Sequence, residues 1–239
     1  MDGWLKSDSM ALGGPSRCAM RSRRKANDLA AEKLAQPYVS EEDVLAVLEQ
    51  WYFSKNTTRT NVFPSGTTSV ESDTLGLVRS RTGKVVATSI TKKWPAVFQL
   101  FCRWLHQHRP PIFERPFACT SISVNYAYGA RKHRDSFNVG PSFTKAFGAF
   151  EGGRLLYWPN DDGACALNEL PETSAVAFES SRESGRILSP CSHPRGCTRG
   201  DRAAHPRRWF CLMAGARMQS RPSRTCPQTS ICRGGARAS

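Results

Sequence analysis

The sequence lacks a hydrophobic run long enough to cross a membrane. Among its 239 residues there is no stretch of about 18 consecutive apolar side chains. Residues 1–25 are polar and basic, without the apolar segment of a secretory signal. We therefore expect no membrane partner. Apolar residues still make up 39% of the chain and aromatic residues 10%, enough for a hydrophobic core and too many for a chain disordered throughout.

Paired cysteine motifs are also missing. None of the nine cysteines belongs to a C-x-x-C pair, which argues against a zinc ribbon. An odd number of cysteines without a secretory signal favours a reducing compartment. We expect an intracellular protein, cytoplasmic or nuclear, and the sequence gives no indication of its oligomeric state.

Lysine is absent from residues 182–239, which nevertheless hold 12 arginines against two acidic residues. That segment contributes +10 of the formal net charge of +14, and residues 1–181 contribute only +4. Hydrophobic periodicity also stops near Arg182. We therefore expect residues 182–239 to form a basic tail of low order, and residues 1–26, rich in Gly, Ser and Arg, to form a disordered leader.

Regular patterns fill the segment between them, residues 27–181. Helical periodicity predicts amphipathic helices over residues 41–53, after a capping-box start at Ser40, and from Trp94 to about residue 108. Residues 75–90 are typical of a hairpin. Short strands are predicted at residues 117–128, 142–150, 154–158 and 173–178. Two helices followed by successive strands indicate a mainly β domain, with helices packed on an antiparallel barrel or sandwich.

The segment that carries chemistry centres on His133-x-Asp135, at the end of a predicted strand. Side chains two residues apart on an extended backbone point the same way, so an imidazole and a carboxylate can converge on one ion. With a distant second histidine they would form the facial triad of non-haem Fe(II). An isolated H-x-D motif is weak, and its ordinary interpretation is a surface histidine beside an aspartate.

The context of this motif resembles the oxygenase domain of the Fe(II)/2-oxoglutarate-dependent dioxygenases, especially the branch similar to TET/JBP oxygenases. The resemblance rests on TSISVN at residues 120–125, H-x-D-x-x-N-x-G-x-S at residues 133–142 and G-x-F-x-G-G-x-L at residues 148–155. It implies a double-stranded β-helix, or jelly-roll, fold. It also implies Fe(II) with 2-oxoglutarate as co-substrate, His133 and Asp135 as iron ligands, and oxidation of a substrate C–H bond, with a nucleobase among the candidate substrates.

The same resemblance implies a second histidine, followed about nine residues later by an arginine that pairs with 2-oxoglutarate. His193 with Arg202 reproduces this spacing, and His205 with Arg217 is a poorer alternative. The residues around them lack the expected apolar strand, so the jelly roll is expected to be incomplete at its C-terminus. A change of reading frame near residues 180–190 is one hypothesis for that mismatch.

The sequence also suggests three other interpretations. His133-Arg134-Asp135 spells the HRD of a kinase catalytic loop, but the Asn that should follow five residues after the aspartate is missing and no Gly-rich loop accompanies it. An inactive remnant of the dioxygenase fold is the main alternative to an enzyme. A nucleic-acid-binding protein that acts through its Arg-rich tail is the alternative from a different class.

Overall fold

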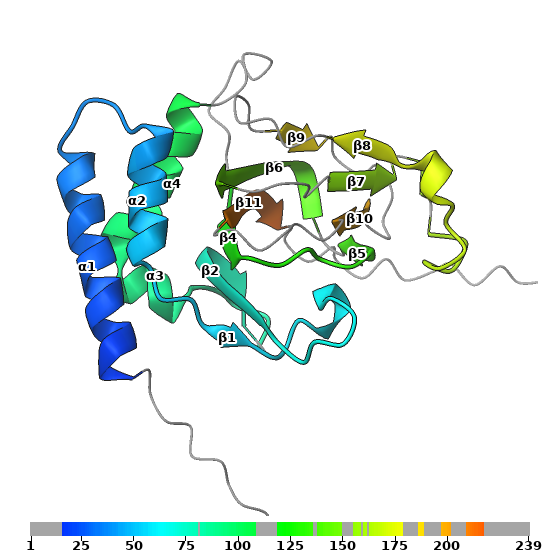
Figure 1. The fold of residues 1–239 in the computed structure, drawn as a ribbon, viewed down its shortest axis with the longest axis horizontal. Helices are drawn as coiled ribbons and strands as arrows, with labels where there is room; N and C mark the ends of the chain where they lie inside the picture. The colour runs from blue at the N-terminus through cyan, green and yellow to red at the C-terminus, as the bar shows by residue number, and fades with distance from the viewer. Residues whose placement is uncertain are drawn as a thin grey trace, which may run out of the picture.

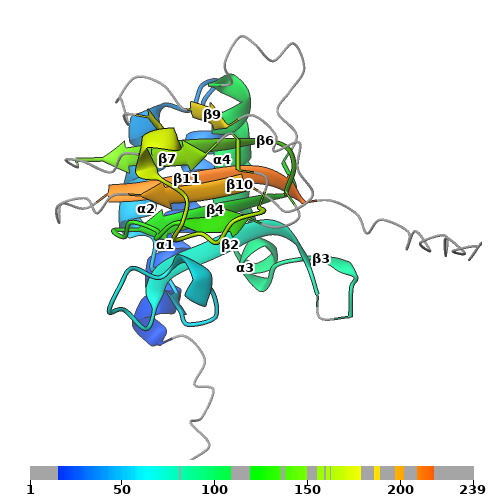
Figure 2. The ribbon, with the colours of Figure 1, turned by 90° about the vertical axis from the view of Figure 1, so that its right-hand side faces the viewer.

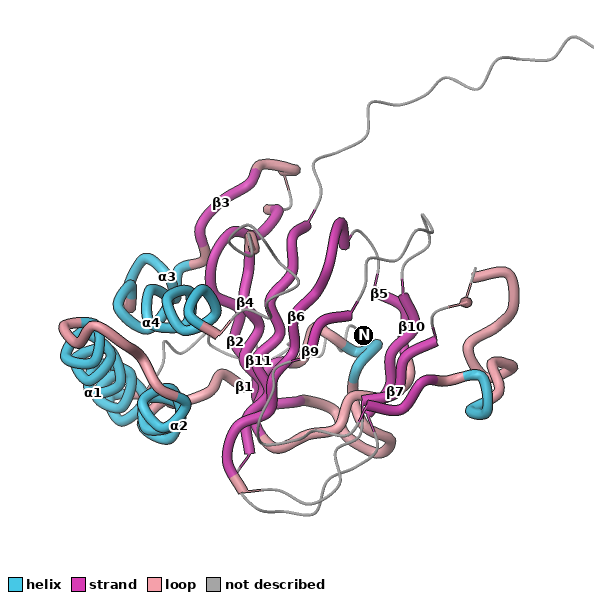
Figure 3. Tube along the Cα trace, turned by 90° about the horizontal axis from the view of Figure 1, so that it is seen from above, coloured by secondary structure: helices cyan, strands magenta, loops and turns pink. Residues whose placement is uncertain are grey.

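The molecule consists of three layers: a group of helices, a large antiparallel sheet and a smaller antiparallel sheet (Figures 1 and 3). The computed structural model describes residues 16–80, 82–108, 119–135, 138–149, 155–158, 160–161, 163–178, 186–188, 197–201 and 209–217. The helices lie on one face of the large sheet, and the smaller sheet lies on the other side of it (Figure 3). Among the described residues, no helix is both long and apolar enough to pass through a bilayer.

The helices begin where the sequence supplies caps. They are α1 (Arg17–Leu34), α2 (Glu41–Gln50), α3 (Ser89–Lys93) and α4 (Pro95–Gln107), with 3₁₀ turns at Thr60–Val62 and Glu172–Ser174. The predicted capping box of α2 is present, since Ser40 and Asp43 bond reciprocally to each other's main-chain N–H. Pro95 occupies the first turn of α4, where its missing N–H leaves no helical bond unmade.

Helix α1 corrects the expected extent of the leader. Residues 17–26 are helical, although the sequence suggested disorder up to residue 26, and residues 1–15 lie outside the described residues. Ala19, Ala26 and Ala30 are fully buried, which lets α1 approach its neighbours closely. Arg23 on the same helix forms a 3.0 Å ion pair with the buried Asp73 of the large sheet. Small residues and one buried ion pair therefore hold this basic helix in place.

The large sheet has the strand order β1-β2-β4-β11-β6-β9, and β3 pairs with β2; all its pairs are antiparallel. Its strands are β1 (Lys55–Asn56), β2 (Val70–Arg79), β3 (Val85–Ala87), β4 (Ser121–Tyr126), β6 (Asn138–Gly148), β9 (Arg186–Leu188) and β11 (Trp209–Arg217). The predicted hairpin is β2 and β3, and it extends away from the other strands (Figure 2).

The smaller sheet has the order β5-β10-β7-β8, again antiparallel throughout. Its strands are β5 (His133–Asp135), β10 (Cys197–Asp201), β7 (Leu155–Trp158) and β8 (Val176–Phe178). From β4 onward the chain passes repeatedly between the sheets. Strands β4, β6, β9 and β11 belong to the large sheet, and β5, β7, β8 and β10 belong to the smaller one.

Strands β9, β10 and β11 differ from the expectation of a low-order tail, because all three come from residues 182–239. Strand β11 occupies the middle of the large sheet, paired with β4 on one side and β6 on the other. Strand β10 lies between β5 and β7 in the smaller sheet. The segment after Arg182 thus supplies interior strands of both sheets.

The two faces of the large sheet differ in polarity. Toward the helices, Leu75, Ile122, Val124, Phe143 and Phe147 join one buried core with the apolar face of α4. Trp104 of α4 meets the rings of Phe143 and Phe147 edge-on. The residues that alternate with this apolar set on β2, β4 and β6 are mostly hydroxyl and amide residues: Ser72, Thr74, Ser121, Ser123, Asn125, Ser142 and Thr144. Since successive strand residues face opposite ways, these polar groups lie on the face turned away from the helices.

Candidate metal site

His133 opens strand β5 and is 5% exposed. Its Nδ1 lies 2.7 Å from the main-chain carbonyl oxygen of Arg131. A carbonyl oxygen can only accept a hydrogen bond, so Nδ1 must carry the proton. In a neutral imidazole Nε2 then bears the lone pair, the tautomer found in histidines that bind metal through Nε2.

The turn before β5 is fixed by contacts to the 3₁₀ turn at Thr60–Val62. The Arg131 main-chain N–H donates to the carbonyl of Val62, and the Arg131 guanidinium donates to the carbonyls of Asn61 and Thr60 at 3.2 and 3.1 Å. The carbonyl that accepts from His133 therefore belongs to a residue held in three places. This arrangement orients the imidazole before any ligand binds.

Arg134 follows His133 and makes a two-point ion pair with Asp161. Its Nε and one terminal nitrogen donate to the two carboxylate oxygens at 2.7 and 2.8 Å, and that terminal nitrogen also donates to the carbonyl of Cys165. The Asp161 side chain is 1% exposed. The carboxylate beside it raises the pKa of the Arg134 guanidinium, so this group stays charged.

Asp135 ends β5, two residues after His133, so both expected ligands share one short strand. Strand β10 runs antiparallel beside it, with Cys197 opposite Asp135 and Arg199 opposite His133. His193, the candidate third ligand, and Arg202, the candidate partner of 2-oxoglutarate, both lie outside the described residues. In sequence, His193 precedes the start of β10 and Arg202 follows its end directly.

Among the described residues, no group of three His, Cys, Asp or Glu side chains is arranged to hold a metal ion. The two expected ligands on β5 are an imidazole and a carboxylate. These are the two ligand types of the facial triad that binds Fe(II), so their chemistry fits that metal. A complete site needs one more protein ligand from the rest of the chain.

Two residues near the site gained roles that the sequence did not assign. Asp161 is the ion-pair partner of Arg134, and a separation of 27 residues gives no local signal in the sequence for this pair. Asn125 lies on the polar side of β4 and accepts a 2.9 Å hydrogen bond from the Tyr128 hydroxyl.

Comparison with known proteins gives distant structural likeness only. No protein-family model matches the chain, and no curated protein matches it in sequence. Similar solved structures include an oxidoreductase of the 2OG-Fe(II) oxygenase family from Burkholderia pseudomallei. The two sequences are 12% identical, the match covers 80% of this chain and 88% of the other, and the TM-score is 0.38.

Two further solved structures show similarly distant likeness. NgTET1 in complex with 5mC DNA has 11% identity over 61% of this chain and 60% of its own, with a TM-score of 0.38. A Pseudomonas putida prolyl-4-hydroxylase has 13% identity over 82% of this chain and 88% of its own, with a TM-score of 0.34. These TM-scores are too low to establish a shared fold.

Proposed function

We propose that this protein is an Fe(II)- and 2-oxoglutarate-dependent dioxygenase that oxidises a C–H bond of its substrate. The observation that carries the proposal is the buried imidazole of His133, whose Nδ1 proton is held by the Arg131 carbonyl. That bond leaves the lone pair of the neutral imidazole on Nε2, the atom that we propose as the metal ligand, and Asp135 follows two residues later on the same strand. His193 is the proposed third ligand and Arg202 the proposed partner of the co-substrate.

The strand connectivity supports the proposal. Eight strands, β4 to β11, are divided equally between two antiparallel sheets, and the chain crosses from one sheet to the other at six of the seven connections between them. Jelly rolls are double-sheet structures of eight antiparallel strands. We therefore propose the double-stranded β-helix fold for residues 121–217, with β1 to β3 extending the large sheet and the helices covering its outer face.

The polar face of the large sheet supports it as well. Ser72 pairs with Asn125 in register and Thr74 with Ser123, so hydroxyl and amide groups lie side by side across β2 and β4. A purely structural sandwich would fill this face with apolar side chains. Hydroxyl and amide groups there suit a polar co-substrate with two carboxylates held between the sheets.

In the proposed mechanism the bound iron and 2-oxoglutarate supply the oxidising chemistry. The chain supplies position and environment. His133 must be neutral to bind, and the Arg131 carbonyl keeps its proton on Nδ1. The ion pair between Arg134 and Asp161 fixes β5, and Arg202 would orient the co-substrate through its far carboxylate. The two sheets would limit the access of water to a metal held between them.

The proposal is tested by metal titration and by turnover. Purified protein should bind Mn(II), a redox-inert substitute for Fe(II), and should release succinate from 2-oxoglutarate when Fe(II) is present. His133→Ala and Asp135→Ala should each weaken Mn(II) binding by more than the roughly 10–100-fold typical of an outer-shell partner. His106→Ala, at an exposed position on α4, is the matched control and should bind normally.

The outcomes separate the enzyme from its alternatives. Equal metal affinity in wild type and His133→Ala would overturn the ligand assignment. Metal binding that depends on His133 without any release of succinate would identify an inactive form of the site. His193→Ala and Arg202→Ala test the two remaining positions, and methylated DNA is included as substrate because the sequence resemblance named a nucleobase.

A further inference from the structure

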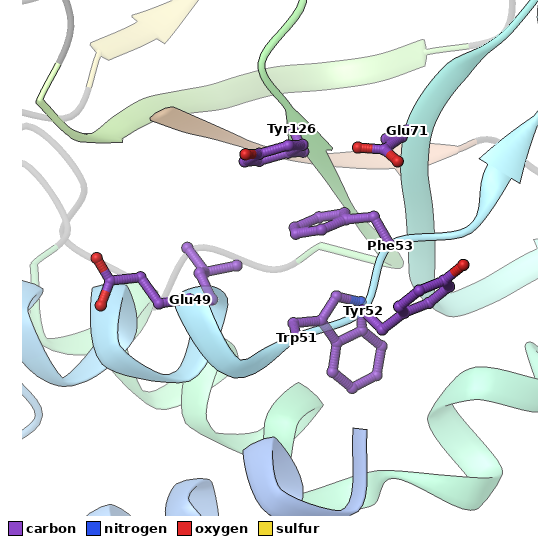
Figure 4. A pocket seen from close by; sticks show the side chains of 7 residues that line it. Glu49, Trp51, Tyr52, Phe53, Glu71 and Tyr126 are labelled. Carbon is purple, nitrogen blue, oxygen red and sulfur yellow. The ribbon is translucent and has the colours of Figure 1, made fainter. Parts of the chain in front are cut away.

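A cavity of about 200 Å³ lies on the helix side of the large sheet, at the end of α2. It is lined by Leu48, Glu49, Trp51, Tyr52, Phe53, Glu71 and Tyr126. Four of these seven residues are aromatic and two are acidic, and Figure 4 shows the two carboxylates to either side of the Phe53 ring. Neither the sequence resemblance nor the proposed metal site involves this cavity.

The cavity is separate from the proposed metal site. Glu71 and Tyr126 are register partners on β2 and β4, and Tyr126 packs against the core beneath the helices. They thus lie on the opposite face of the large sheet from Ser72 and Asn125. His133 belongs to the smaller sheet, on the far side of that polar face. A ligand in the cavity would not touch β5.

The aromatic walls are held in place by contacts around them. The Trp51 indole N–H donates to the buried Asp73 carboxylate at 2.8 Å, and the guanidinium of Arg23 lies 4.9 Å from the Trp51 ring. The rings of Phe53 and Tyr126 stack with 5.5 Å between their centroids. Asp73 also pairs with Arg23, so the guanidinium beside the Trp51 ring is neutralised by its own partner. The walls therefore keep their shape without a ligand.

Glu49 and Glu71 give the cavity its negative charge. Both residues are exposed, and neither forms an ion pair with any residue that the structure describes. Some other carboxylates of the described residues are paired, as Asp43 is with Lys33 and Asp161 with Arg134, in a chain with a formal net charge of +14. Two unpaired carboxylates beside aromatic rings favour a positively charged occupant.

We propose that this cavity binds an alkylated ammonium cation. Aromatic faces attract cations, and rings combined with carboxylates recognise quaternary ammonium groups in particular. An unmodified ammonium is strongly hydrated, so its desolvation costs more free energy than that of an alkylated ammonium. Methyl groups on the nitrogen also make apolar contact with the aromatic rings. The cation can come from a free choline-type molecule or from a methylated lysine side chain of a peptide, since both present the same headgroup.

The full-length protein is titrated with tetramethylammonium, with choline and with 3,3-dimethyl-1-butanol, the uncharged isostere of choline. Binding is followed by calorimetry and by the fluorescence of Trp51 and its neighbours. Choline should bind at least about tenfold more tightly than the isostere, because only choline carries the charge. Equal binding of the two, or no binding of either cation, would overturn the proposal.

Charge variants test the residues. Glu49→Gln and Glu71→Gln keep the shape of each side chain, and each should weaken choline binding about threefold to tenfold. Glu32→Gln, at an exposed position on α1, is the matched control and should bind as wild type does. Circular dichroism confirms folding of each variant. Unchanged affinity in the Glu49→Gln, Glu71→Gln double variant would contradict the proposal.

Two further arms complete the experiment. A peptide with trimethyllysine that binds at least tenfold more tightly than tetramethylammonium assigns the cavity to a peptide; equal affinities assign it to the small molecule. His133→Ala should leave choline affinity unchanged, because that residue lies in the other sheet. The cation site and the dioxygenase proposal can therefore fail independently of each other.

Discussion

Arg134 and Asp161 face each other through two hydrogen bonds of 2.7 and 2.8 Å between guanidinium and carboxylate. The arginine is the middle residue of β5, and the aspartate follows β7 after a short turn. The pair therefore ties the strand that carries His133 to another strand of the same small sheet. A strand of three residues makes few main-chain hydrogen bonds, so the ion pair contributes to holding β5 in position.

The first prediction concerns that ion pair. Asp161→Asn keeps the size of the side chain but leaves the Arg134 guanidinium without its charged partner. Asp161 is buried and Arg134 is partly buried, so the free energy of unfolding should fall by about 2 kcal/mol. Urea denaturation measures it.

Mn(II) titration of Asp161→Asn gives a second readout, because a displaced β5 should also weaken metal binding at His133. The control is Asp28→Asn, at an exposed position on α1, which should change stability by less than about 0.5 kcal/mol. Equal stability of the two variants would show that the pair does not anchor β5.

The second prediction concerns the capping box of α2. Asp43 accepts a 3.0 Å hydrogen bond from the Ser40 main-chain N–H and pairs with Lys33 at 3.1 Å. Burial alone would raise the pKa of Asp43, but the bonds from Ser40 and the charge of Lys33 outweigh it, so the pKa lies below its ordinary value of 3.8. Asp43→Ala should therefore lower the free energy of unfolding by about 1 kcal/mol at pH 7.

The pH dependence of this loss follows from the direction of the shift. A carboxyl whose pKa is lower in the folded state stabilises the fold above its unfolded pKa and loses that effect as the pH falls through its folded pKa. The difference between wild type and Asp43→Ala should thus be larger at pH 7 than at pH 3. Chemical denaturation at the two pH values measures it, and an equal difference at both would contradict the assignment.

The third prediction concerns Gly76 in β2. Its φ of +92° is strained for other residues, and an added Cβ would lie 2.4 Å from the carbonyl oxygen of Thr120. Because that neighbour is main chain, it cannot move aside as a flexible side chain would. Gly76→Ala should therefore cost about 3 kcal/mol or more, from backbone strain and steric overlap together.

Gly66 separates the two causes of that loss. Its φ of +78° is similar, but a Cβ there would meet nothing within 4 Å. Gly66→Ala should cost only the strain, about 1 kcal/mol. Thermal denaturation of both variants measures the difference, and equal losses would mean that the contact with Thr120 is not limiting.

Local signals in the sequence predicted helices α2 and α4 and most strands of residues 27–181, but not α1 or α3. Helices α2 and α4 have caps and a continuous apolar face, and the structure has them at nearly the expected bounds. Residues 89 and 90 were expected in the hairpin but begin α3, because Thr88 caps a helix there. Strands β4, β6, β7 and β8 all lie within or close to the expected ranges.

Strand β11 shows why the rest was missed. Residues 209–214 read WFCLMA, an apolar run that by itself indicates a buried strand. Arginines, prolines and cysteines dominate the composition of residues 182–239. A prediction from the average composition of this segment therefore missed the short apolar run within it. Strands β9 and β10, of three and five residues, carry no such pattern, because they are stabilised by pairing with β6, β5 and β7.

Some features of the candidate site could be predicted from the sequence, and others depend on the fold. The spacing of His133 and Asp135 is local and readable, and both residues belong to one strand. The hydrogen bond to the Arg131 carbonyl and the ion pair with Asp161 depend on how the chain folds back on itself. His193 and Arg202 remain predictions.

The central place of β11 sets the order in which the large sheet can be completed. Its neighbours β4 and β6 are synthesised about 60 to 90 residues earlier by the ribosome, and neither can find its partner until residues 209–217 have emerged. Until then both expose unpaired edges, the condition under which nascent chains aggregate. A premature stop before residue 209 should yield insoluble protein, whatever the fate of the residues beyond 217.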